Sequence, residues 1–305
     1  MTIFCQCHWQ KMGDHSVQAS KNPDWQCSHI LEGYNGIVRA LLVTSNWLVS
    51  GSADGKIRVW RLGCWESPQS VLEGHASEVT SLVAEGEFVF SGSSDKTIRM
   101  WKLGTWECVH VLGGHAQNVW ALVTSKDHLF SGSFDQSIRM WRVAACRCEH
   151  VLGERIGLVF SLAVNDHFLF SGSLDRAIRV WRKEDGELQH VVQAHSSGVW
   201  SLVVYKNFLI SGAAEGDIRV WSLGSWVCVK ELRGHTHCVA SLAVRGDLLF
   251  SASADESVRV WRLGTWECIR ILQGHTGFVN AVAATDKWLF SGANDQTIRV
   301  WNIAV

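Results

Sequence analysis

The sequence predicts an all-β protein assembled from seven copies of one unit of about forty residues. Tryptophan recurs along the 305-residue chain at spacings of 41 residues once and 40 residues five times, at Trp60, Trp101, Trp141, Trp181, Trp221, Trp261 and Trp301. Each of these tryptophans closes a near-copy of one phrase, such as FSGSSDKTIRMW in residues 90–101 and FSGANDQTIRVW in residues 290–301. No stretch keeps a helical period of apolar residues over ten residues, so the repeated unit is built from strands.

The unit that ends at Trp141 shows how each copy divides into four short strands. Residues 106–112 alternate in polarity and mix β-branched with aromatic residues, as an edge strand does. Residues 119–123 and 129–133 are apolar runs, and residues 138–141 are the last run before the next copy begins. Polar, turn-forming residues separate these runs, which have the length of strands.

Most copies begin with a Gly-His pair, and the pairs are Gly74-His75, Gly114-His115, Gly234-His235 and Gly274-His275. A four-stranded unit with these residues at fixed positions, repeated seven times, resembles the WD-repeat β-propeller family. The resemblance covers residues 24–303 and implies a seven-bladed β-propeller of four-stranded antiparallel blades. One departure is general, because the residue after each blade tryptophan is never Asp: it is Arg61, Lys102, Arg142, Arg182, Ser222, Arg262 or Asn302.

The two ends of the chain indicate how such a ring closes. Only four residues follow Trp301, so the last unit lacks its outermost strand. Residues 25–33 match residues 106–114, which form the outer strand of a complete unit. The resemblance implies that residues 24–33 complete the seventh blade, and an open ring would leave one sheet edge unpaired. We therefore expect one propeller domain over residues 24–303.

Residues 1–23 are expected to form a disordered or loosely packed N-terminal tail. This tail contains four residues that could ligate zinc, namely Cys5, Cys7, His8 and His15. The ligand pairs of common zinc fingers are separated by two to four residues, and the Cys-x-Cys-His arrangement does not have that spacing. The sequence therefore assigns no metal and no cofactor, and leaves zinc in the tail as the alternative.

A histidine, a serine, an acid and the blade tryptophan recur at fixed spacing in most copies. Together they invite a hydrolase interpretation, but one active site needs only one such set. In the family that the chain resembles, these residues form a buried hydrogen-bonded network inside each blade, which supplies a buried acid with donors. The full sets are His75, Ser91, Asp95 and Trp101; His115, Ser131, Asp135 and Trp141; His235, Ser251, Asp255 and Trp261; His275, Ser291, Asp295 and Trp301.

Three copies depart from this set. The first has Tyr34 at the histidine position, the fourth has Arg155, and the fifth keeps His195 but pairs it with Glu215. We expect the fourth blade to be the least rigid at its upper loop, because its network lacks the histidine.

Function is expected where the copies differ, since the shared residues build the scaffold. In the family that the chain resembles, partner contacts cluster on one mouth of the ring, at three positions per blade. Carried over to this sequence, those positions are mostly apolar in blades three to five, and an exposed aromatic cluster marks an interaction surface. The candidate partner-binding residues are Trp120, Phe134, Leu158, Phe160, Leu174, Trp200, Phe278, Arg39 and Glu78. The alternative is that some of these side chains fill the central channel and touch no partner.

Composition excludes several classes of partner. Lys and Arg together number 28 against 29 for Asp and Glu, so the net charge is -1. The chain therefore lacks the excess positive charge that binding to nucleic acid or to an anionic membrane calls for. No apolar run approaches the roughly 18 residues that span a bilayer. The ten cysteines occur in a chain that shows no signal peptide, so we expect reduced thiols in a cytoplasmic protein, with the nucleus as the alternative.

These observations predict a non-enzymatic scaffold or adaptor that binds a hydrophobic peptide or helix from a protein partner. We expect a monomeric propeller that works within larger complexes. A weaker resemblance to the propellers of RING- or TRAF-type ubiquitin ligases and of some protein kinases gives the alternative, substrate recognition for a ligase or kinase supplied elsewhere. An enzyme is disfavoured, since the mouth positions lack a cluster of His, Asp or Glu for acid–base chemistry.

Overall fold

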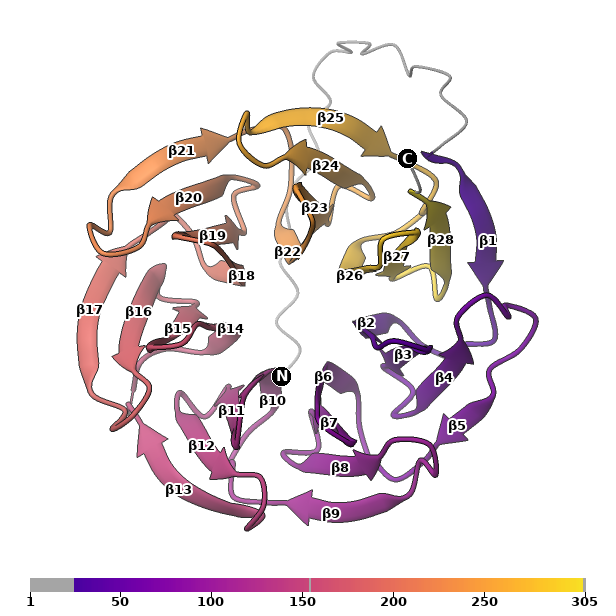
Figure 1. The fold of residues 1–305 in the computed structure, drawn as a ribbon, viewed down its shortest axis with the longest axis horizontal. Helices are drawn as coiled ribbons and strands as arrows, with labels where there is room; N and C mark the ends of the chain where they lie inside the picture. Colours follow the sequence, from indigo (N-terminus) through magenta and orange to yellow (C-terminus); the bar gives the residue numbers. More distant parts are fainter. Residues whose placement is uncertain (1–24, 154, 304–305) are drawn as a thin grey trace.

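The computed structural model describes residues 25–153 and 155–303, which form a closed ring of β-sheets around a central axis (Figure 1). The prediction of an all-β, seven-bladed propeller is confirmed: the strands form seven four-stranded antiparallel sheets. The expected tail of residues 1–23, with its four candidate zinc ligands, lies outside the described residues.

The strands run outward in each blade, so that the first lines the centre of the ring and the fourth forms its rim (Figure 1). We number the blades from the one that contains β2. Blade 1 contains β2 (Val38–Val43), β3 (Trp47–Ser52), β4 (Ile57–Arg61) and β5 (Ser70–Leu72). Blade 2 contains β6 (Val79–Glu85), β7 (Phe88–Ser93), β8 (Ile98–Lys102) and β9 (Cys108–Leu112). Blade 3 contains β10 (Val119–Ser125), β11 (His128–Ser133), β12 (Ile138–Arg142) and β13 (Arg147–Leu152). Blade 4 contains β14 (Val159–Val164), β15 (Phe168–Ser173), β16 (Ala177–Arg182) and β17 (Leu188–Gln193).

Blade 5 contains β18 (Val199–Tyr205), β19 (Phe208–Ala213), β20 (Ile218–Ser222) and β21 (Cys228–Leu232). Blade 6 contains β22 (Val239–Arg245), β23 (Leu248–Ser253), β24 (Val258–Arg262) and β25 (Glu267–Leu272). Blade 7 contains β26 (Val279–Ala284), β27 (Trp288–Ala293), β28 (Ile298–Asn302) and, as its outer strand, β1 (Cys27–Leu31).

The ring closes where the sequence predicts, because the N-terminal strand completes the last blade. Strand β1 pairs antiparallel with β28, with Leu31 opposite Ile298 and Ile30 opposite Arg299. The Leu31 side chain is 1% exposed and packs in one hydrophobic cluster with Trp60 of blade 1 and Phe290 of blade 7. The closing strand therefore joins the first and last blades through both backbone hydrogen bonds and core packing.

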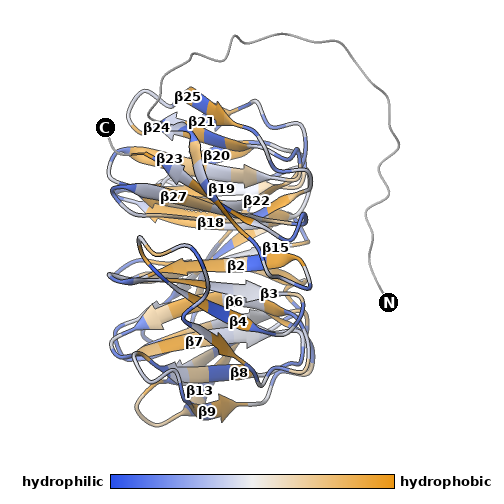
Figure 2. Cartoon of the chain, turned by 90° about the vertical axis from the view of Figure 1, so that its right-hand side faces the viewer, coloured by the Kyte–Doolittle hydropathy of each residue, from blue (hydrophilic) through white to orange (hydrophobic). Residues whose placement is uncertain are grey.

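The second strand of each blade is buried because it lies between the neighbouring blades. In β7 every residue after Phe88 is buried, and the same pattern recurs in the second strand of every blade. At Gly92 the packing leaves little room for a side chain, because an added Cβ would lie 2.9 Å from Val119 Cγ1 of the next blade. Hydrophobic clusters cross from blade to blade in the same way, as where Val49 of blade 1 packs with Val89 and Trp101 of blade 2. The side view in Figure 2 shows the two flat faces of the ring that this stacking produces.

Candidate functional site at the mouth of the ring

The His–Ser–acid–Trp sets form hydrogen-bonded networks within blades 2, 3, 5, 6 and 7. In blade 6, His235 Nδ1 lies 2.7 Å from Asp255 Oδ2 and its Nε2 lies 2.7 Å from Ser251 Oγ. The indole of Trp261 donates to the same Ser251 oxygen at 2.9 Å. Equivalent bonds occur in blades 2, 3 and 7, through His75, His115 and His275, and in blade 5 through His195 and Glu215. The acid also caps its turn, since Asp255 accepts from the backbone N–H groups of Ser257 and Thr236.

These networks cannot act as hydrolase triads, although they contain the same residue types. The network serines Ser91, Ser131 and Ser251 are each 0% exposed, so their hydroxyl groups are inaccessible to a substrate. Each hydroxyl is already bonded to both a histidine and a tryptophan. Buried and repeated polar sets of this kind stabilise a fold when all their groups are bonded.

Blades 1 and 4 lack the network histidine, and a different residue packs or bonds beside the blade tryptophan in each. In blade 1 the phenol of Tyr34 takes its place, 2.6 Å from Ser50 Oγ and accepting from Trp60 Nε1 at 3.0 Å. Burial raises the pKa of Tyr34 well above its ordinary value, so the phenol stays neutral. In blade 4 the Arg155 side chain is exposed, and Ile156 is buried in a cluster with Trp181 instead. The blade 4 acid, Asp175, pairs with Arg179 and is 35% exposed.

The network carboxyl groups make stability sensitive to acid. Burial alone would raise the pKa of Asp255, but hydrogen bonds from His235 and Ser257 hold it well below its ordinary value. The pKa values of Asp95, Asp135, Asp295 and Glu215 are lowered by similar bonds. A carboxyl group whose pKa is lower in the folded state stabilises the fold above its unfolded pKa of about 4, and this contribution is lost as the pH falls.

We therefore expect the free energy of unfolding to fall steadily as the pH decreases below about 4.5. A smaller loss begins below about pH 6.5, since burial lowers the pKa of His195 and His275 and their protonation favours the unfolded chain. Guanidinium chloride unfolding at a series of pH values measures both effects. A midpoint that is constant between pH 7 and pH 3 would contradict this assignment.

Four aromatic side chains from three consecutive blades form one contiguous cluster at the mouth. Trp120 of blade 3 stacks on Phe134, with ring centroids 4.9 Å apart, and Phe160 of blade 4 stacks on Trp200 of blade 5 at 4.4 Å. The two stacks meet edge to face, with 6.0 Å between Trp120 and Phe160 and 6.4 Å between Trp120 and Trp200. Such stacked and edge-to-face pairs stabilise one another beyond the burial of their area.

The cluster faces the centre of the ring because of an irregularity in the inner strands. The register of each inner strand shifts at its second residue, at Arg39, Thr80, Trp120, Phe160, Trp200, Ala240 and Asn280. A β-bulge bends the strand and re-aims the side chain of the extra residue. Each inner strand thus directs one variable side chain at the top of the channel, a feature that residue spacing alone did not reveal.

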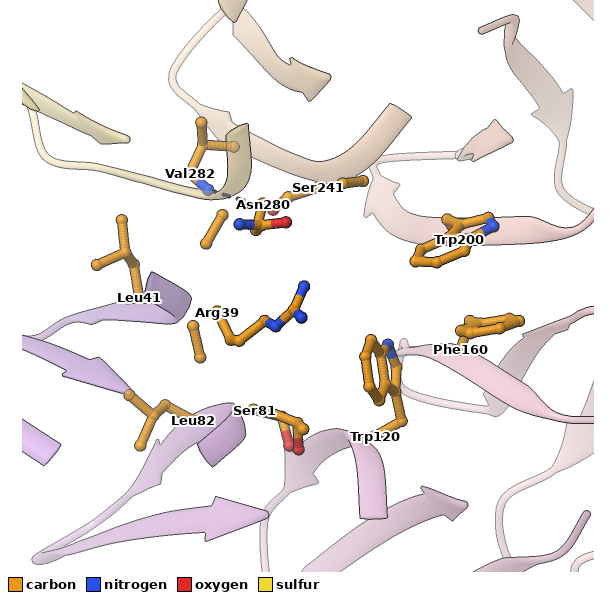
Figure 3. A pocket seen from close by; sticks show the side chains of 14 residues that line it. Arg39, Leu41, Ser81, Leu82, Trp120, Phe160, Trp200, Ser241, Asn280 and Val282 are labelled. Carbon is orange, nitrogen blue, oxygen red and sulfur yellow. Dashed lines mark hydrogen bonds between the residues drawn. The ribbon is translucent and has the colours of Figure 1, made fainter. Parts of the chain in front are cut away.

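These residues line a central cavity of about 200 Å³. Trp120, Phe160 and Trp200 form one wall, and Arg39 reaches in from the other side (Figure 3). The residues that follow the bulges on the inner strands complete the lining, and the repeat pattern does not mark them: Ala40, Leu41, Ser81, Leu82, Ser241, Ala281 and Val282. The aromatic side chains therefore line the central channel, as the alternative prediction held, and they also border open space that a partner could enter.

Two mouth residues connect neighbouring blades. Thr80 Oγ1 donates to the carbonyl of Val119 in the next blade at 2.5 Å. Asn280 Nδ2 donates to the carbonyl of Val38 across the junction between blades 7 and 1 at 3.1 Å. These polar residues contribute to ring closure in addition to lining the cavity.

The remaining candidate residues lie around the aromatic cluster or apart from it. Leu158 is half-buried, whereas Leu174 is 47% exposed and its Cδ1 lies 3.2 Å from where a Cβ on Gly198 would be. Gly198 is therefore covered by Leu174. Phe278 is 50% exposed, but it belongs to blade 7, outside the three blades of the cluster. Arg39 and Glu78 form an ion pair, with 3.4 Å between Nε and Oε2.

A closed ring of seven blades, with buried polar networks and one variable mouth, defines a β-propeller whose shared residues build the scaffold. The WD domain, G-beta repeat model matches seven times, at residues 25–61, 66–102, 106–142, 146–182, 186–222, 226–262 and 266–302. The chain belongs to the WD40-repeat family. Propellers of this family typically serve as scaffolds for protein interaction.

Among solved structures, the crystal structure of the computationally designed Ika8 protein is similar, with 29% sequence identity and a TM-score of 0.73. The similarity covers 90% of this chain and 98% of the designed one. A search of curated proteins gave no match. In the described part of the chain, no helix is long and apolar enough to cross a membrane. Over the same residues, no group of three or more His, Cys, Asp or Glu side chains is placed to hold a metal ion.

Proposed function

We propose that this propeller is a non-enzymatic adaptor that binds an apolar segment of a protein partner at the mouth bordered by Trp120, Phe134, Phe160 and Trp200. The observation that carries the proposal is the contiguous aromatic cluster of blades 3 to 5 on the edge of an open cavity. Tryptophan is enriched at the energetic centres of protein interfaces. The scaffold needs no such cluster, because the equivalent bulge positions hold Ala240 in blade 6 and Thr80 in blade 2.

The chemistry of the mouth supports an apolar protein ligand over other classes. Around the cavity, the ion pair between Arg39 and Glu78 leaves the two charges balanced. A polyanion such as single-stranded nucleic acid calls for a positively charged groove beside its aromatic platforms. Phe160 is buried, but the half-buried rings of Trp120, Phe134 and Trp200 and the balanced charge instead favour a peptide that buries an apolar side chain.

Affinity capture tests this proposal with a matched pair of variants. Trp120→Ala with Trp200→Ala removes both indoles from the cavity wall. Val227→Ala with Val229→Ala removes apolar side chains that are 58% and 50% exposed at the rim, on and next to β21. We expect the variant Trp120→Ala with Trp200→Ala (the mouth variant) to lose the proteins that the wild type captures, and the variant Val227→Ala with Val229→Ala (the rim variant) to keep them. Thermal melting checks that both variants fold. Equal capture by the mouth variant and the wild type would rule the site out.

A further inference from the structure

The cavity is too small for a folded segment, and this narrows what can enter it. Its volume of about 200 Å³ is below the roughly 300–1,000 Å³ of pockets that hold drug-sized ligands. An α-helix with its side chains is about 10–12 Å across, so a helix can lie over the mouth but cannot enter it. The space suits a single amino-acid residue.

One wall of this space holds a guanidinium group, that of Arg39, which is ion-paired with Glu78 but has no hydrogen bond at its Nε. Arg39 extends from β2 toward the cavity (Figure 3). Its Nε is shielded from solvent and has no hydrogen-bond partner in the described part of the chain. Glu78 is its ion-pair partner, but at 3.4 Å from Nε it does not accept a hydrogen bond with proper geometry. The Nε atoms of several blade arginines, such as Arg99 and Arg259, are shielded and unbonded in the same way, so the feature specific to Arg39 is that its guanidinium end extends into the cavity (Figure 3). A ligand in the cavity can supply an acceptor to the terminal guanidinium nitrogens, which are not shielded.

The guanidinium selects a carboxylate by its shape. Its planar donors match the two oxygens of a carboxylate, and such charge-assisted bonds are stronger than neutral ones. The Glu78 side chain is 35% exposed, so it can turn toward water when a ligand carboxylate replaces it beside Arg39.

The opposite wall selects an apolar group at the same time. Trp120, Phe160 and Trp200 present aromatic surface to the cavity that Arg39 enters. A ligand the size of one residue must therefore carry both an apolar side chain and a carboxylate. The last residue of a protein chain has this combination, and it needs no room for backbone continuing beyond it.

Building on the proposed function, we propose that the channel takes the C-terminal residue of a partner protein. A bulky apolar side chain packs on Trp120, Phe160 and Trp200, and the terminal carboxylate accepts hydrogen bonds from Arg39. The preceding residues of the partner lie across the exposed Leu174 and the half-buried Phe134 at the mouth.

Matched peptide pools test this proposal. Random N-acetylated heptapeptides that end in Leu, Ile, Phe or Trp are made once with a free terminal carboxylate and once as the amide. Retention on the immobilised full-length protein is measured by mass spectrometry. We expect the free acids to be retained about tenfold more than the amides, as the loss of a charged hydrogen bond implies.

Variants separate this proposal from the proposed function. Arg39→Gln should bring retention of the acids down to that of the amides, and Glu78→Gln should increase the preference for acids by leaving Arg39 without a competing carboxylate. Trp120→Ala with Trp200→Ala should retain neither pool. One outcome would overturn the terminal-carboxylate proposal and leave the proposed function standing. In that outcome the wild type and Glu78→Gln each retain acids and amides equally, and the variant Trp120→Ala with Trp200→Ala retains neither pool. Selection of amides with an internal Asp or Glu would also overturn it, and retention independent of the tryptophans would overturn both.

Discussion

Deleting residues 1–33 is expected to abolish cooperative folding of the ring. The deletion removes β1, exposes the edge of β28 and leaves the hydrophobic cluster of Trp60 and Phe290 without Leu31, which is 1% exposed. An unpaired strand edge also becomes a site for association with other chains. Blade 7 would keep only β26, β27 and β28, and Trp60 of blade 1 would lose its packing against Leu31.

Circular dichroism and calorimetry measure this effect. A shorter deletion that ends at residue 23 is the control, since it separates the closing strand from the residues that precede it. We expect a sharp melting transition for the shorter deletion and a broad or absent one for the longer. If the longer deletion melted at the same temperature as the full chain, the closing role of β1 would be wrong.

Replacing one network acid is expected to have the second largest effect. Asp255→Ala leaves His235, the Ser257 hydroxyl and two backbone N–H groups without their acceptor. The Asp255 side chain is only 9% exposed and that of His235 is fully buried, so water cannot readily replace it. Breaking a buried pair by removing one partner costs about 3–5 kcal/mol, a large share of the stability of a typical domain.

Two further variants make the measurement specific to the network. Glu256→Gln removes a charge from the exposed neighbouring position in the same turn and is expected to leave the unfolding midpoint unchanged. Asp175→Ala in blade 4 should cost less than Asp255→Ala, because that acid is 35% exposed and has Arg179 in place of a histidine. Equal losses for Asp175→Ala and Asp255→Ala would show that the histidine network does not contribute as described.

The repeat made the scaffold predictable from sequence. Fixed spacing of the blade tryptophans defines the blades. The first predicted strand matches the outer strand of a complete blade, and the last blade lacks that strand, so the two were expected to pair. Because Trp261, Ser251 and His235 recur at constant intervals, their hydrogen bonding could be anticipated from chemistry. The substitution of Tyr34 for histidine preserves that chemistry, since a phenol also bonds to serine and indole.

The candidate site was only partly predictable, because its form depends on local backbone geometry. The mouth positions of Trp120, Phe160 and Trp200 came from the family resemblance, but the bulges that point them at the channel arise from strand register. Spacing also could not show that Asn280 bonds to Val38 of the first blade, or that Leu174 covers Gly198. In blade 4, where the histidine is absent, Ile156 is buried in a cluster with Trp181 through packing that one sequence does not reveal.

The central claim is that the aromatic wall of the channel carries the binding energy for a partner. Its most direct test is calorimetric titration of the shortest partner peptide that the wild type binds into the variant Trp120→Ala with Trp200→Ala. Loss of one interface hot spot costs about 2 kcal/mol or more, so the dissociation constant should rise at least about thirtyfold. An unchanged dissociation constant in a variant that folds normally would place the binding site elsewhere on the ring.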